Sequence, residues 1–207
     1  MNRNYSLYLV TDSEICPEGR FLETVEAAIQ GGVTMVQLRE KKLSSRAFYQ
    51  EALALKKLTD AYHIPLIIND RLDIMLAADA AGLHIGQSDL PAEVVRQIMG
   101  RDKILGLSAR TVEQAEAARK AGADYLGVGA VFPTSTKKDA LPLDKEMLRK
   151  IKTAAGLPVV GIGGIKAENI SEIYGSGIDG VAVVSAIMGH SSPKIAAEEL
   201  RNKVEHL

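Results

Sequence analysis

Short apolar runs alternate with amphipathic segments along the whole chain. Between the runs, apolar residues recur at spacings near i, i+3 and i+4, as from Phe21 to Ile29, which is the pattern of a helix with one buried face. This alternation predicts an α/β protein. The runs that we predict to be buried strands are Leu7–Val10, Met35–Leu38, Leu66–Ile68, Leu83–Ile85, Ile104–Leu107, Tyr125–Val128, Pro158–Gly161 and Val181–Val184.

Glycines recur where a predicted helix gives way to a strand. Glycine tolerates the left-handed backbone conformation found at helix C-termini, so we interpret these positions as helix-to-strand turns. They are Gly32, Gly82, Gly122 and Gly177.

Eight strands of this kind fit a closed (β/α)8 TIM-type barrel, but an open doubly wound sheet uses the same units. A barrel needs at least about 200 residues, and the chain has 207. An open sheet would carry a glycine-rich phosphate loop after its first strand, and Val10–Glu14 contains no glycine. We therefore expect one domain, residues 1–207, that forms a closed barrel.

Composition excludes several function classes. The net charge is −1 and aromatic residues are only 4% of the chain, with no Trp, so neither a broad basic field nor enough stacking platforms exists for nucleic acid. Cys16 is the only cysteine, which excludes an internal disulfide and a cysteine-cluster metal site. The longest apolar stretch, Val181–Met188, is too short to span a membrane. We find no signal-peptide pattern and expect a cytoplasmic protein.

Polar residues follow the predicted strands one after another. In a closed barrel the carboxyl ends of all strands share one rim, so these residues would converge on one pocket. They include Thr11–Asp12, Gln37–Lys41, Asn69–Arg71, Gly86–Asp89, Ser108, Pro133–Lys138, Gly163–Gly164 and Ser185.

The charged members of this set point to phosphate chemistry. Asp70 and Asp89 would repel each other without a cation between them, and an oxygen-only pair suits Mg²⁺ that also bridges to substrate phosphates. Arg39 can grip phosphate oxygens as a planar fork, while Lys41 and Lys137 act as point charges. We interpret the group as a clamp for a diphosphate leaving group.

A second anion site is indicated at the last two strands, the usual phosphate position of such barrels. Gly161–Gly164 lets backbone N–H groups approach a phosphate closely, and a helix beginning at Ser185 would offer further N–H donors. Two anion sites imply two phosphorylated substrates, one of which loses diphosphate. The residues alone therefore predict a transferase, with Thr134, Ser135 and Thr136 orienting the acceptor.

Several motifs, in the same order over nearly the whole chain, resemble the thiamine-phosphate synthase family. They are Tyr8–Asp12, Val36–Lys41, Ile68–Arg71, Leu83–Pro91, Gly106–Ser108, Phe132–Ala140 and Gly161–Ile165. The resemblance implies an Mg²⁺-dependent enzyme that joins 4-amino-2-methyl-5-(diphosphooxymethyl)pyrimidine to a thiazole phosphate. Diphosphate would leave first, and the thiazole nitrogen would capture the resulting pyrimidine-methyl cation; a carboxylated thiazole would also lose CO₂.

The resemblance also assigns residues. Asp70 and Asp89 would hold Mg²⁺, and Arg39, Ser108 and Lys137 would take the catalytic roles. Contacts to the pyrimidine diphosphate would come from Gln37, Leu38, Arg39, Glu40, Lys41, Asn69, Ser108 and Lys137. Contacts to the thiazole phosphate would come from Thr134, Ser135, Thr136, Gly164, Val184 and Ser185.

Other interpretations compete with these assignments. Asp70, Asp89 and Ser108 could each cap a following helix, and His84 fits a satisfied residue of the barrel interior better than a catalyst. Arg110 stands where the family often has His; a related thiazole tautomerase would use that His, so Arg110 favours the synthase. A phosphosugar isomerase and a ligand sensor on a degenerate barrel are further alternatives. Whether the chain forms a homo-oligomer stays open.

Overall fold

A closed barrel of parallel strands forms the centre of the molecule. The computed structural model describes residues 3–134 and 142–207. Within them, eight strands pair in sequential order, and β8 pairs back to β1. The strands are β1 (Leu7–Val10), β2 (Met35–Leu38), β3 (Leu66–Asn69), β4 (Gly82–Ile85), β5 (Ile104–Ala109), β6 (Tyr125–Gly129), β7 (Val159–Ile162) and β8 (Gly180–Val183). The expected barrel is confirmed.

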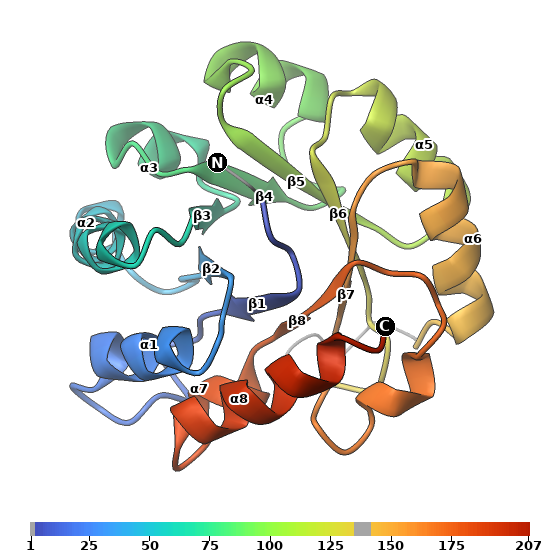
Figure 1. Cartoon of the computed structure of the whole chain (residues 1–207). Coiled ribbons are helices and arrows are strands. Elements are labelled where there is room, and N and C mark those ends of the chain that lie inside the picture. The colour runs from blue at the N-terminus through green and yellow to red at the C-terminus, as the bar shows by residue number, and fades with distance from the viewer. Residues whose placement is uncertain (1–2, 135–141) are drawn as a thin grey trace.

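Helices surround the barrel on its outside (Figure 1). They are α1 (Phe21–Gln30), α2 (Ser45–Ala61), α3 (Leu72–Ala77), α4 (Ala92–Met99), α5 (Val112–Lys120), α6 (Lys145–Ala155), α7 (Ser185–Met188) and α8 (Pro193–Val204), with one 3₁₀ turn, η1 (Ile170–Ile173), between β7 and β8. Ser44, Thr111 and Asp144 each accept a backbone N–H of the first turn, and α2, α5 and α6 begin at these caps. Among the described residues, no helix has the length and apolar character needed to cross a membrane.

Two apolar clusters lie on the two faces of the sheet, because successive side chains of a strand point to opposite faces. In β1, Tyr8 belongs to the cluster inside the barrel and Leu9 to the cluster under the helices. In β2, Met35 lies inside and Leu38 lies outside. The alternation therefore decides which polar residues beyond each strand can face the barrel mouth.

The glycine turns agree with expectation at three positions of four. Gly32, Gly122 and Gly177 have φ of +104°, +83° and +79°. Gly82 does not take the left-handed conformation; it is the first residue of β4, and a Cβ there would overlap Ile104. The left-handed residue of that turn is Asp79, with φ of +50°. Our interpretation of Gly82 was therefore wrong: a close strand contact requires it.

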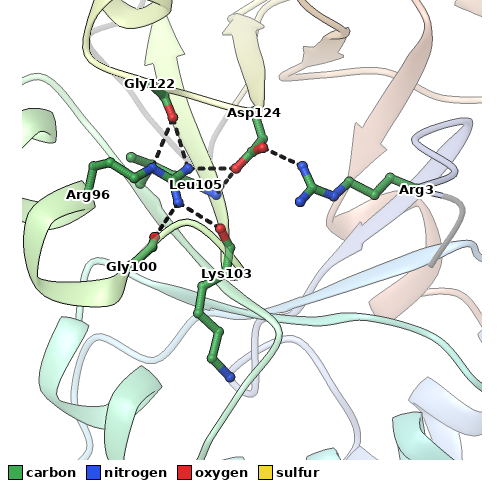
Figure 2. A network of polar contacts seen from close by, with 7 residues as sticks. All are labelled: Arg3, Arg96, Gly100, Lys103, Leu105, Gly122 and Asp124. Carbon is green, nitrogen blue, oxygen red and sulfur yellow. Dashed lines mark hydrogen bonds and ion pairs between the residues drawn. The ribbon is translucent and has the colours of Figure 1, made fainter.

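A polar network lies at the amino end of the barrel (Figure 2). Asp124 accepts hydrogen bonds from the backbone N–H of Leu105 (2.8 Å) and from Arg96 Nη2 (2.6 Å), and Arg3 forms an ion pair with its other oxygen. Arg96 of α4 also donates to the carbonyls of Gly100, Lys103 and Gly122 at 2.8–3.1 Å. The network ties α4 to the loops that precede β5 and β6.

The same kind of anchor recurs around this end. In each case a side chain just before one strand accepts the N–H near the start of the preceding strand. The pairs are Thr34 with Leu7 (3.1 Å), Asp124 with Leu105 (2.8 Å) and Asp179 with Val159 (2.7 Å). These anchors fix the amino ends of the strands and leave the carboxyl ends to carry the site.

Candidate active site

A cavity of about 810 Å³ occupies the carboxyl end of the barrel and receives side chains or backbone from all eight strands. The convergence expected from the sequence is present for most of the chosen residues. Those that line the cavity are Gln37, Arg39, Lys41, Asn69, Asp70, Asp89, Ser108, Thr134, Gly164, Val184 and Ser185.

Two chosen side chains lie elsewhere. Leu38 is fully buried in the cluster under the helices, and Glu40 lies outside the cavity lining, where its Oε2 accepts a hydrogen bond from Ser13 (3.0 Å). Alternation along β2 and its extension explains this placement, since Gln37, Arg39 and Lys41 take the inward positions. Predicted residues Ser135, Thr136 and Lys137 lie outside the described residues.

Arg39 and Lys41 supply positive charge at the rim after β2. The backbone N–H of Arg39 donates to the buried Thr11 Oγ1 (3.1 Å), which fixes where the side chain leaves the strand. The Arg39 guanidinium lies 3.9 Å from the Asp12 carboxylate, and Lys41 Nζ lies 2.5 Å from Asp70 Oδ2. A cation and a carboxylate therefore already meet at this side of the cavity.

The two carboxylates proposed as metal ligands are not helix caps. The N-cap residues of α3 and α4 are Arg71 and Pro91, and neither accepts a side-chain capping bond. Asp70 sits at φ of +60°, a conformation uncommon outside glycine that is often retained at functional sites. Asp89 Oδ2 accepts the backbone N–H of Gly86 (2.7 Å), so its own loop holds it at the cavity.

This donor set fits Mg²⁺ in one specific way. Mg²⁺ is commonly held by one or two carboxylates together with substrate phosphates and water. Asp70 and Asp89 line the same cavity and supply oxygen ligands only. No group of three or more His, Cys, Asp or Glu side chains that could hold a metal occurs within residues 3–134 and 142–207. The site therefore suits an ion that arrives with a phosphorylated substrate.

A continuous chain of side-chain hydrogen bonds crosses the cavity floor. Gln37 Nε2 donates to the Tyr8 hydroxyl (2.9 Å), which meets the Tyr125 hydroxyl (2.9 Å). The Tyr125 hydroxyl meets His84 Nδ1 (3.0 Å), and His84 Nε2 meets Ser108 Oγ (3.0 Å). Burial lowers the pKa of His84 to about 4, so its ring is neutral at physiological pH.

These contacts decide two earlier alternatives. Ser108 does not cap the next helix, because Thr111 caps α5 through its own hydroxyl. His84 is an interior residue with partners on both ring nitrogens, as expected, but it also lines the cavity. Tyr8 and Tyr125 line it too, and sequence reasoning missed them because a tyrosine in a buried strand has the pattern of a core residue.

The loop after β7 turns through two glycines in the left-handed conformation. Gly163 and Gly164 have φ of +99° and +66°, and a Cβ on Gly164 would lie 2.5 Å from the Pro133 carbonyl oxygen. Asn169 holds the loop by donating to the Gly164 carbonyl (2.9 Å). Only glycine therefore fits at Gly164 without displacing the chain after β6.

Arg110 also lines the cavity, on the β5 side. Its Nη1 donates to the Gly129 carbonyl (2.9 Å), and its backbone N–H donates to Gln114 Oε1 (2.7 Å). The side chain therefore connects the ends of β5 and β6.

Comparison with known proteins identifies the family. A family profile described as thiamine monophosphate synthase matches residues 7–187. A thiamine-phosphate synthase of Alkaliphilus oremlandii is 54% identical over 202 residues, which cover 98% of this chain and 97% of that protein. The chain belongs to the thiamine-phosphate synthase family. The resemblance seen in the sequence is thereby confirmed.

Further relatives agree with this assignment. A thiamine-phosphate synthase of Ruminiclostridium cellulolyticum is 57% identical and covers 95% of this chain and 94% of that protein. A solved structure of thiamine phosphate pyrophosphorylase from Pyrococcus furiosus superposes with a TM-score of 0.90 at 42% identity, covering 98% of this chain and 96% of that one. The chain is therefore an enzyme with thiamine-phosphate synthase activity, which favours the synthase over the tautomerase and isomerase alternatives.

Proposed function

We propose that this thiamine-phosphate synthase condenses 4-amino-2-methyl-5-(diphosphooxymethyl)pyrimidine with a thiazole phosphate or carboxythiazole phosphate, giving thiamine phosphate and diphosphate, and also CO₂ when the thiazole is carboxylated. One observation carries the proposal. Arg39, Lys41, Asp70 and Asp89 line the same cavity as Gly164 but at the opposite side of the barrel, after β2–β4 rather than after β7. A cavity with two separate anion sites suits two phosphorylated substrates.

The leaving diphosphate would bind at the β2–β4 side. Arg39 would bind its oxygens as a planar fork and Lys41 as a point charge, and Lys137 would add a third cation. Arg39 and Lys41 are held at the rim by their ion pairs with Asp12 and Asp70, so they would stabilise the negative charge that develops on the leaving oxygen. Mg²⁺ held by Asp70 and Asp89 would supply further neutralisation of the diphosphate charge.

The organic part of the first substrate would lie on the cavity floor, against Gln37 and Ser108. The C–O bond breaks with its electron pair going to diphosphate, and the methylene carbon becomes a cation conjugated with the pyrimidine ring. The thiazole nitrogen then donates its lone pair to that carbon and forms the new C–N bond.

The second substrate would place its phosphate at the β7–β8 side. The backbone of Gly163, Gly164 and Ser185 would approach the phosphate oxygens, and Thr134 would orient the ring. Small-molecule substrates, a cytoplasmic location and an Mg²⁺ requirement are parts of the same proposal.

The test combines both phosphorylated heterocycles with Mg²⁺ and measures diphosphate release together with thiamine phosphate formation. We expect turnover with the wild-type protein and a loss of roughly 100-fold or more in kcat for Arg39→Ala and Asp89→Ala, because each removes a charge at the leaving group. Removal of Mg²⁺ with a chelator should have the same effect, and re-addition should restore activity.

Asp102→Ala serves as the matched control, since Asp102 is an exposed carboxylate outside the cavity lining. Circular dichroism of each variant shows whether the barrel is intact. Wild-type kcat in Arg39→Ala or Asp89→Ala would remove the assigned role of that residue, and metal-independent turnover would remove the role of Mg²⁺.

A further inference from the structure

The hydrogen-bond chain on the cavity floor joins residues of five different strands. Gln37 comes from β2, Tyr8 from β1, Tyr125 from β6, His84 from β4 and Ser108 from β5. All five line the cavity. Three of them, Tyr8, Tyr125 and His84, have no part in the mechanism described so far, although their polar atoms connect its two floor residues without a gap.

The number of protons on each group decides which atom donates at every step of this hydrogen-bond chain. Each tyrosine hydroxyl carries one proton and can donate it once. The Gln37 amide donates to the Tyr8 oxygen, so the Tyr8 proton is left for Tyr125. Tyr125, having accepted, then donates its own proton to His84 Nδ1. That nitrogen must be the unprotonated one.

The direction continues through the imidazole ring to Ser108. A neutral imidazole has one N–H, and with Nδ1 accepting, the proton resides on Nε2 and is donated to Ser108 Oγ. Ser108 accepts within the chain, so its own proton is left for a ligand. The side-chain amide nitrogen of Gln37 donates within the hydrogen-bond chain, which leaves the side-chain oxygen Oε1 to accept from a ligand.

We propose that Tyr8, Tyr125 and His84, with His84 in the Nε2–H form, are positioning residues that set an acceptor at Gln37 and a donor at Ser108. A ligand that matches this pair carries an amino donor and a ring-nitrogen acceptor, as an aminopyrimidine does. The inference rests on the proposed function for the identity of that ligand. The hydrogen-bond chain thereby selects an amino-substituted pyrimidine and disfavours one with a carbonyl in place of the amino group.

Two glycines leave room for the Tyr125 and His84 rings of the hydrogen-bond chain. A Cβ on Gly106 of β5 would overlap the Tyr125 ring, and a Cβ on Gly127 of β6 would lie 2.9 Å from His84 Cε1. The hydroxyl of Tyr5, whose ring centroid lies 5.1 Å from that of Tyr125, takes no part in the chain. Tyr5 is therefore a matched control for the removal of a buried tyrosine hydroxyl.

The first test is the protonation of His84 in the ligand-free protein. Long-range ¹H–¹⁵N correlation spectra of histidine-labelled protein at neutral pH distinguish the two neutral forms of imidazole. A His84→Gln variant identifies the signal among the four histidines of the sequence. We expect the Nε2–H form alone. The Nδ1–H form would mean that the chain runs in the opposite direction, and it would overturn the proposal, as would a mixture of the two.

The second test compares Tyr125→Phe with Tyr5→Phe. Tyr125→Phe removes the link between Tyr8 and His84, so we expect KM for the pyrimidine diphosphate to rise roughly tenfold. KM for the thiazole phosphate should stay within about twofold. Tyr5→Phe should change neither KM. Equal effects of the two variants, or equal effects on both substrates, would overturn the positioning role.

The two tests separate this inference from the proposed function. The spectra need no substrate, so they decide the direction of the chain even if the wild-type protein makes no thiamine phosphate. An active enzyme whose His84 carries its proton on Nδ1 would leave the proposed function intact and refute the inference alone.

Discussion

Glu51 of α2 shows how a single carboxyl group can make stability depend on pH. Its Oε2 atom is buried and has no hydrogen-bond partner among the described residues. Burial, followed by the nearby Glu40, raises the pKa of Glu51 from its ordinary value to about 7. The folded protein therefore binds a proton more tightly here than the unfolded chain does.

The sign of the effect follows from linkage. Because the pKa is raised in the folded state, the stabilisation is present below about pH 4.5 and is lost as the pH rises toward 7. We expect wild-type protein to lose about 2 kcal/mol relative to Glu51→Gln between pH 5 and pH 8. Urea unfolding of the two proteins at both pH values measures the difference.

The comparison has to be a difference between variants, because His84 acts in the opposite direction. The pKa of His84 is lowered to about 4, so its contribution to stability is lost as the pH falls from about 6.5 toward 4. Glu116→Gln, at an exposed position of α5, is the control and should leave the pH dependence unchanged. Parallel curves for wild type and Glu51→Gln would contradict the assignment.

At the scale of elements, the two ends of the barrel differ in function: one carries stabilising contacts and the other carries the cavity. The amino end carries the Arg96–Asp124 network and the recurring strand anchors, and the carboxyl end carries the cavity. This division is typical of TIM barrels, in which the amino-terminal face serves stability. A change at one end should therefore affect folding without affecting chemistry.

Arg96→Met tests that division. It leaves the Asp124 carboxylate without its α4 partner and removes the donor of three backbone carbonyls, so we expect a loss of about 2–4 kcal/mol in the free energy of unfolding. The kcat/KM of the folded fraction should stay within about twofold of wild type. Arg101→Met, at an exposed position in the loop before β5, should change neither quantity. A tenfold loss of kcat/KM in Arg96→Met would show that the ends are coupled.

The elements themselves were largely predictable from the sequence. The apolar runs gave all eight strands to within about two residues, because short buried strands flanked by turn residues have few alternatives. Strand alternation, applied to Gln37–Lys41, would also have moved Leu38 and Glu40 away from the cavity. The reason for a glycine at position 82 was not predictable, because it is the close approach of Ile104 on the neighbouring strand.

At the scale of the whole molecule, the cavity should couple ligand binding to stability. If Asp70 and Asp89 hold Mg²⁺ only together with phosphate oxygens, Mg²⁺ and pyrophosphate bind well only as a pair. We expect the two together to raise the melting temperature by about 5 °C, and either one alone to raise it by less than about 1 °C. A thermal unfolding series with no ligand, with each ligand and with both measures this.

Asp89→Asn is the critical variant, since it keeps the size of the side chain and removes its charge. The joint effect should disappear in Asp89→Asn and persist in Asp102→Asn. A full shift with pyrophosphate alone, or an unchanged joint shift in Asp89→Asn, would argue against a shared metal site.

The contact between Tyr8 and Tyr125 could not be predicted from the sequence, because it forms only when the barrel is closed. Tyr8 and Tyr125 lie on β1 and β6, which are not neighbours in the sheet, and their hydroxyls meet across the interior. No spacing in the sequence encodes that meeting. By contrast, charged residues such as Arg39 and Asp89 stand out at strand ends in any sequence with this strand order.

The pairing of β8 with β1 also has a consequence for biosynthesis. Leu7 leaves the ribosome well before its β8 partner Val181 is made. Until then β1 exposes an unpaired edge, which is a hazard for aggregation. The enclosure of the cavity floor must likewise wait for β8, so nascent chains that stop before Gly180 should be inactive and should depend on chaperones to stay dispersed.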